Sequence, residues 1–152
     1  MSLRIYRRDL PHLRLDGATY WVTWNLRRRQ SPLRPAERAI VASTIRHFDG
    51  VQFDLHAFVV MDDHVHVVVT TTPGVALEAI VHSWKSFSAW RLQREEGRPG
   101  ALWQEECYDR IVRDDQELTQ KVSYVLNNPR RRWPGIIRYE WAWARGMEAE
   151  DG

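Results

Sequence analysis

The chain has 152 residues, a length that fits one domain with a hydrophobic core and leaves no room for two. Hydrophobic residues make up 43% and charged residues 28%, and the net charge of +2 is too small to indicate a nucleic-acid partner by itself. The single cysteine, Cys107, excludes an intramolecular disulfide and a metal cage made of cysteines. The first residues lack the apolar core of a signal peptide and no apolar run could span a membrane, so we expect a cytoplasmic protein without membrane contact.

The hydrophobic pattern predicts seven elements in the order β-α-β-β-α-β-α. Strands are predicted over residues 18–26, 51–61 and 64–72 and within 103–113, and helices over 35–48, 75–96 and 116–127. We predict that Pro129 stops the last helix. This order is typical of an α+β, ferredoxin-like (RRM-like) antiparallel sheet with two helices on one face. The last helix is left to cover the other face.

Two histidines lie two positions apart in a valine-rich run, which favours a strand. Because residues i and i+2 of a strand share a face, His64 and His66 project from the same side of the sheet. Asp62 and Asp63 separate two strand-like runs and predict a tight hairpin turn, which would put Val59 opposite His66. Two neighbouring imidazoles on a rigid strand form half of a metal site.

The last predicted helix carries Lys121, Tyr124 and Asn128 on one face, because residues three and four apart are neighbours on a helix. If this face covers the histidines, the Asn128 carbonyl oxygen can join them as a metal ligand and Tyr124 can act as a nucleophile. Nitrogen and amide-oxygen ligands with open positions suit Mg²⁺ or Mn²⁺. A free tyrosine has a pKa of about 10, so the metal or Lys121 would have to assist its ionisation.

Arginines are concentrated in two short clusters, and the chain has eight tryptophans. Aromatic rings beside arginines are typical of single-stranded nucleic-acid binding, although core packing and surface solvation explain many such residues. We predict that both clusters contact phosphates, because they flank the proposed site; they consist of Arg27, Arg28, Arg29, Arg130, Arg131 and Arg132.

An ordered set of motifs makes the chain resemble a known family. These are Gly17-x-x-Tyr20-x-x-Thr23, Met61-x-x-His64-Val65-His66, Trp84-Lys85-Ser86, Leu102-Trp103-Gln104 with Tyr108-Asp109-Arg110 and Arg113-Asp114, and Tyr124-Val125-x-x-Asn128-Pro129. The sequence resembles the HUH-type single-tyrosine (IS200-like) transposases, most closely their REP-associated tyrosine transposase branch. The resemblance implies one domain over residues 1–152, with a core of about 17–133 and a C-terminal extension of 134–152.

The family resemblance also implies an activity. It implies a metal-dependent transposase and endonuclease that cleaves and rejoins single-stranded, hairpin-bearing or REP-like DNA. Tyr124 would form a 5′-phosphotyrosine intermediate and release a 3′-OH, and His64, His66 and Asn128 would hold Mg²⁺ or Mn²⁺. Some relatives exchange the tyrosine helix between subunits, but for this chain we favour a monomer over a homodimer.

Several alternatives stay open. The turn before the histidines is usually Pro-Asn in this family, and the Asp62-Asp63 found here could contact the metal indirectly or repel phosphate. Tyr108 is a rival nucleophile, although it lacks a ligand partner four residues on. A domesticated, non-catalytic hairpin-DNA-binding module is the main alternative function. A histidine-triad hydrolase is disfavoured by Val68, and an RNA-binding module by the absence of an obvious aromatic pair on adjacent strands.

Overall fold

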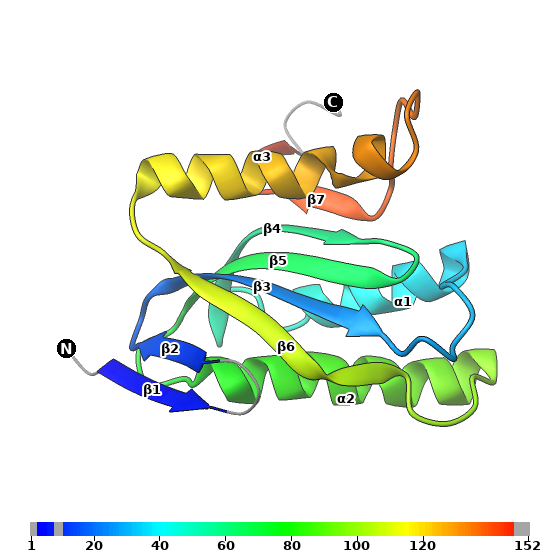
Figure 1. Ribbon diagram of the computed structural model, residues 1–152, viewed down its shortest axis with the longest axis horizontal. Coiled ribbons are helices and arrows are strands. Elements are labelled where there is room, and N and C mark those ends of the chain that lie inside the picture. Colours follow the sequence, from blue (N-terminus) through cyan, green and yellow to red (C-terminus); the bar gives the residue numbers. More distant parts are fainter. Residues whose placement is uncertain (1–2, 8–10, 148–152) are drawn as a thin grey trace.

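A five-stranded antiparallel sheet is the centre of the computed structural model, which describes residues 3–7 and 11–147 (Figure 1). Its strand order is β6-β3-β5-β4-β7. The strands are β3 (Thr19–Leu26), β4 (Phe53–Val60), β5 (His64–Thr71), β6 (Trp103–Val112) and β7 (Ala142–Ala144). The helices are α1 (Pro35–Arg46), α2 (Leu77–Glu96) and α3 (Asp115–Arg132). Figure 1 shows the sheet lying between α3 on one side and α1 and α2 on the other.

The predicted ferredoxin-like fold is confirmed by the four strands β6-β3-β5-β4 and the two helices α1 and α2. Two parts of the observed fold were not predicted. A separate antiparallel pair, β1 (Leu3–Arg7) and β2 (Pro11–Leu15), precedes the main sheet. In the C-terminal extension, β7 adds a fifth strand beside β4, and residues 148–152 of that extension lie outside the described residues.

The face of the sheet that meets α1 and α2 holds the main hydrophobic core. Val65, Val67 and Val69 alternate with the histidines of β5, and all three valines are fully buried in this core. The large ring of Trp24 on β3 stacks on Trp84 of α2, with ring centroids 5.7 Å apart. Burial of this valine and aromatic surface makes the sheet a rigid platform for the residues on its other face.

The other face of the sheet is covered only in part, by α3. The helix begins at an Asp114 side chain that accepts a hydrogen bond from the Glu117 backbone N–H at 2.8 Å, as N-capping requires. The fully buried Val125 then packs into a second cluster with Val59 and Met61. The chain after α3 returns to the same sheet edge, where the Tyr139 hydroxyl donates to the Val60 carbonyl oxygen at 2.7 Å. Helix α3 and the segment that follows it therefore both contact β4.

The prediction that Pro129 stops the last helix is wrong. Helix α3 continues to Arg132, one turn further. Proline removes one backbone N–H donor, but its carbonyl oxygen still accepts a hydrogen bond from Trp133 N–H at 2.8 Å. Both Asn128 and Pro129 are buried, so tertiary packing outweighs the local cost of the proline. Asn128 consequently lies inside a helix with a fixed backbone, rather than at a frayed end.

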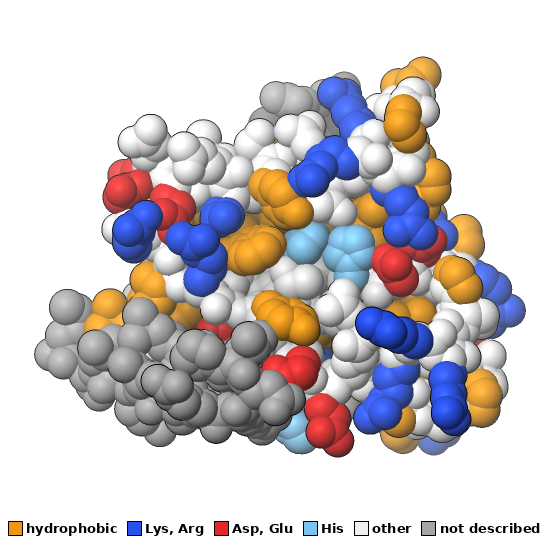
Figure 2. Space-filling model, viewed as in Figure 1, with side chains coloured by type: hydrophobic (Ala, Val, Ile, Leu, Met, Phe, Trp, Pro, Cys, Tyr) orange, Lys and Arg blue, Asp and Glu red, His pale blue; other side chains and the backbone are white. Residues whose placement is uncertain are grey.

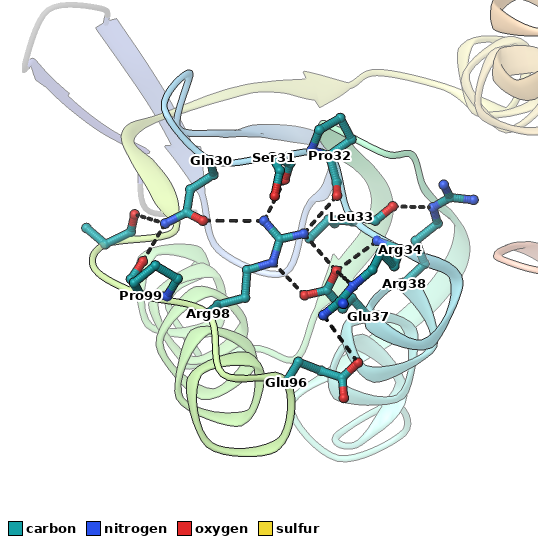
Figure 3. Close-up of polar contacts among 11 residues, drawn as sticks. Gln30, Ser31, Pro32, Leu33, Arg34, Glu37, Arg38, Glu96, Arg98 and Pro99 are labelled. Atoms are coloured by element: carbon teal, nitrogen blue, oxygen red, sulfur yellow. Dashed lines mark hydrogen bonds and ion pairs between the residues drawn. The ribbon is translucent and has the colours of Figure 1, made fainter.

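A buried ion pair fixes the loop that carries the first arginine cluster (Figure 3). The Arg98 guanidinium donates to the Glu37 carboxylate at 2.7 Å and to the backbone oxygens of Ser31 and Pro32 at 2.5 and 2.8 Å. Burial alone would raise the pKa of the Glu37 carboxyl, but hydrogen bonds from Arg98 and Arg34 outweigh it and lower the pKa to about 2. The loop after β3 is thereby tied to the end of α2.

In residues 3–7 and 11–147, none of the helices combines the length and the apolar character needed to cross a membrane.

Candidate active site

Two histidines from β5 form the centre of the candidate site. Their ring centroids are 4.7 Å apart, and His66 is only 5% exposed. Val59 of β4 is the register partner of His66, so the predicted two-residue turn at Asp62 and Asp63 is confirmed. Figure 2 shows two histidine side chains near the middle of this face, with hydrophobic side chains beside them and Lys and Arg side chains to either side.

Each histidine has its Nδ1 atom engaged by a neighbouring side chain. The Thr23 hydroxyl lies 2.6 Å from Nδ1 of His66, and a carboxylate oxygen of Asp63 lies 2.7 Å from Nδ1 of His64. Because a carboxylate only accepts hydrogen bonds, Nδ1 of His64 carries a proton, and in the neutral form of the ring Nε2 keeps a lone pair. Such a partner is what fixes the tautomer and orientation of a metal-binding histidine.

Helix α3 brings a third polar atom to this pair. Oδ1 of Asn128 lies 3.1 Å from Nε2 of His64, and the Asn128 side chain is buried. When His64 is neutral with its proton on Nδ1, both of these atoms are acceptors, and a cation between them would satisfy both. Neighbouring ligands of an octahedral ion such as Mg²⁺, each about 2.1 Å from it, are about 3 Å apart. The residues present thus fit a divalent metal held by His64, His66 and Asn128.

A metal ion at this site would need the amide oxygen of Asn128 as a ligand. Among the described residues, no three or more His, Cys, Asp or Glu side chains form a group that could hold a metal ion. Burial, together with the charges of His64 and Arg131, lowers the pKa of His66 to about 3. His66 is therefore neutral at physiological pH, the form that can donate a lone pair to a metal.

Tyr124 lies beside His66, one histidine of the pair. Its ring lies edge-on to His66 and to Trp21, with centroid distances of 5.6 and 5.9 Å. Tyr124 is 37% exposed, so its ring is accessible from solvent. The Arg131 guanidinium lies 4.8 Å from the centroid of the Tyr124 ring and adds positive charge beside it. The other predicted residue of this helix face, Lys121, places its ammonium 4.8 Å from the centroid of the Trp21 ring.

The two arginine clusters divide by their contacts. All six arginines are exposed, and Arg27 also donates through Nε to the Trp103 backbone oxygen at 3.0 Å. Arg132 pairs with Asp62 at 3.0 Å and with Asp63 at 3.6 Å. The Arg132 side chain of α3 therefore neutralises part of the charge of the acidic turn. Burial alone would raise the pKa of the Asp63 carboxyl, but the hydrogen bond and charge of His64 and the charge of Arg132 outweigh it and lower the pKa.

Sequence reasoning gave no role to two residues of β3. Trp21 stacks on His66 with a centroid distance of 5.4 Å, and Thr23 orients the same ring through its hydroxyl. Alternation along β3 placed both residues on one face, but only the pairing of β3 with β5 reveals that this face is that of the histidines.

Comparisons with known proteins place this fold in a family. A family model described as "Transposase IS200 like" matches residues 15–128, a span that contains the histidine pair, Tyr124 and Asn128. A REP-associated tyrosine transposase of Escherichia coli K12 is 24% identical and covers 76% of this chain and 68% of its own length. A Haemophilus influenzae protein, provisionally described in the same terms, is 22% identical and covers 95% of this chain and 88% of its own length.

Among solved structures, a REP-associated tyrosine transposase bound to a REP hairpin has the same fold. Its TM-score is 0.69 at 22% identity, and the match covers 90% of this chain and 80% of that protein.

Proposed function

The chain belongs to the family of IS200-like transposases, and on that premise we propose that it cleaves and rejoins single-stranded DNA that carries a hairpin. The observation that carries this proposal is the convergence of Tyr124 and Asn128 from α3 on His64 and His66 of β5. One solved relative is bound to a REP hairpin, which supports a REP-like hairpin as the substrate.

In the proposed reaction, the Tyr124 oxygen attacks a backbone phosphorus. Its bond to phosphorus forms while the bond between phosphorus and the 3′ oxygen breaks, which leaves a 5′-phosphotyrosine and a free 3′-OH. The phenol loses its proton and the 3′ oxygen gains one. Attack by a 3′-OH on the phosphotyrosine reverses the step, so strand transfer needs neither water nor a nucleotide.

His64, His66 and Asn128 would hold Mg²⁺ or Mn²⁺, which when bound supplies Lewis-acid polarisation of a phosphate oxygen. Asp63 and Thr23 hold the two imidazoles in the orientation that ligation requires. Arg131 contributes charge beside Tyr124, and the exposed arginines Arg28, Arg29 and Arg130 are placed to contact phosphates further away.

We further propose that the site is complete within one subunit, since α3 is held over its own sheet by β7 and by the Arg132 contacts with the turn. We therefore propose that the protein acts as a monomer. We also propose that it acts in the cytoplasm. The neutralised turn favours turnover over the binding-only alternative, because Arg132 reduces the repulsion that Asp62 and Asp63 would exert on phosphate.

A denaturing gel tests the proposed reaction. The protein is mixed with labelled hairpin-bearing single-stranded DNA and Mg²⁺ or Mn²⁺, and wild type is compared with Tyr124→Phe, His64→Ala and Tyr108→Phe. We expect a metal-dependent covalent protein–DNA band in wild type and Tyr108→Phe, and none in the other two. A band that survives in Tyr124→Phe contradicts the assignment of the nucleophile. Tight binding without any band in wild type would instead identify a non-catalytic hairpin-binding module.

A further inference from the structure

The face of the sheet that holds the histidines has an open half. Helix α3 covers β4 and the adjoining part of β5. Beneath it, Ala57 and Val59 of β4 and Val68 of β5 are fully buried. On β6 two residues of this face are exposed. Tyr108 on β6 is 41% exposed, and the Arg110 side chain two positions further is 52% exposed. The candidate active site lies at the boundary between the covered and the open half.

Tyr108 belongs to the same row of residues as the active-site histidine. It is the register partner of Thr23, and Thr23 is the register partner of His66. Directly opposed residues in an antiparallel sheet share a face, and neighbouring strands are about 4.8 Å apart, so Tyr108 and His66 are about 10 Å apart across the sheet. In the adjacent row, Arg110 opposes Trp21, which stacks on His66.

The open half therefore carries an aromatic residue on each of two adjacent strands. The sequence reading found no obvious pair of this kind, because the pairing of β3 with β6 joins segments that are far apart in the chain. The Trp21 ring already contacts the side chains of His66, Tyr124 and Lys121. Among the described residues, the Tyr108 ring stacks on no other ring. A partly exposed ring without an aromatic partner in the fold is available to a ligand with a flat aromatic surface.

The charges around Tyr108 favour a nucleic-acid ligand. Arg110 lies on the same strand and face, with Glu117 as an ion-pair partner at 3.8 Å, and Lys121 and Arg131 stand on the α3 side of the same opening. Bases of a duplex are stacked on each other, so only an unpaired base offers a free face to Tyr108. Aromatic side chains within a positive groove are the general means of binding such bases.

We propose that the open half of this face binds one unpaired base of the DNA strand beside the scissile phosphate, with Tyr108 stacked on the base and Arg110 near its phosphate. This inference rests on the proposed function, because it names a subsite for the same strand. It also gives Tyr108 a role other than that of nucleophile. This base-binding subsite would hold the DNA strand so that the scissile phosphate, next to the bound nucleotide, lies beside Tyr124.

The test measures binding in the absence of cleavage. Full-length protein in a Tyr124→Phe background, with EDTA, is titrated against fluorescent hairpin DNA with single-stranded flanks, and anisotropy is recorded. We expect Tyr108→Ala to weaken binding by about tenfold, as loss of one base stack does. Tyr108→Phe and Tyr108→Trp should bind within about twofold of the parent, because they keep the ring. Trp90→Ala, which removes an exposed ring on α2, is the matched control and should bind like the parent.

An abasic scan of the flanking strand identifies the base. One abasic position should weaken the parent by about the same factor as Tyr108→Ala, and should have no further effect on the Tyr108→Ala protein. Equal affinity of Tyr108→Ala and parent, or a loss that no single abasic position reproduces, overturns the inference. Both results are independent of the covalent band, so failure of this subsite and failure of the proposed cleavage are distinguishable.

Discussion

Oδ1 of Asn128 and Nε2 of His64 lie 3.1 Å apart, although the two residues are separated by 64 positions and belong to a helix and a strand. The contact joins the helix that carries the tyrosine to the strand that carries the histidines. It exists because Val125, one turn before Asn128 on α3, is buried against β4 and β5.

Replacement of Asn128 should weaken metal binding. In Asn128→Ala the affinity for Mn²⁺, measured by electron paramagnetic resonance of free and bound Mn²⁺, should fall by at least about tenfold, since even outer-shell partners have effects of this size. Asn128→Asp should bind Mn²⁺ more tightly than wild type, because it adds a negative charge to the same oxygen position. Asn127→Ala removes an exposed amide from the same helix and should bind Mn²⁺ like wild type. Equal affinities in Asn127→Ala and Asn128→Ala would remove Asn128 from the ligand set.

Asp63 should fix the tautomer of His64. In wild type without metal, two-bond ¹⁵N–¹H NMR spectra should show the proton of His64 on Nδ1, where it is donated to the carboxylate at 2.7 Å. Asp63→Ala should give a mixture of tautomers and reduce Mn²⁺ affinity by about 10–100-fold. Asp63→Asn keeps an acceptor oxygen and should retain the Nδ1-protonated form. A single Nδ1-protonated tautomer in Asp63→Ala would show that another group controls the ring.

Loss of Arg98 should destabilise the fold strongly. Arg98→Ala leaves the buried Glu37 carboxylate without its main partner, and the free energy of unfolding in urea should fall by about 3–5 kcal/mol at pH 7. Arg91→Ala removes a solvent-exposed pair with Glu95 and should cost less than about 1 kcal/mol.

The same pair predicts a pH dependence of stability. The pKa of Glu37 is lowered to about 2 in the folded protein, so its contribution is present above the ordinary carboxyl pKa and is lost as the pH falls towards 2. Glu37→Gln should therefore lose less stability than wild type between about pH 4.5 and pH 2. Parallel stability curves for the two proteins over that range would contradict the assignment.

The exposed arginines should determine the salt dependence of DNA binding. Arg28→Ala and Arg29→Ala should each reduce the slope of log K against log salt concentration by about 0.7, the value for one phosphate contact on a single strand. Arg94→Ala, which removes an arginine that lies over the Trp90 ring on α2, should leave the slope unchanged. Unchanged slopes for all three variants would place the DNA elsewhere on the molecule.

The sequence by itself determined the features that depend on local periodicity. A period of two placed His64 and His66 on one face of a strand, and a period near four placed Tyr124 and Asn128 on one face of a helix. The order of these elements was enough to predict the ferredoxin-like sheet. These inferences hold because alternation and helical spacing are properties of neighbouring residues, which a single chain displays directly.

Only the tertiary structure decided which distant segments meet. The pairing of β3 with β5 and β6 brings Thr23 to His66 and puts Tyr108 in the same row, and the docking of α3 brings Arg132 to the acidic turn. Packing also overrode a local signal, since the helix continues past Pro129. Strand order, helix docking and side-chain ion pairs are fixed by the burial of surfaces that are far apart in the sequence. No local pattern along the chain encodes them.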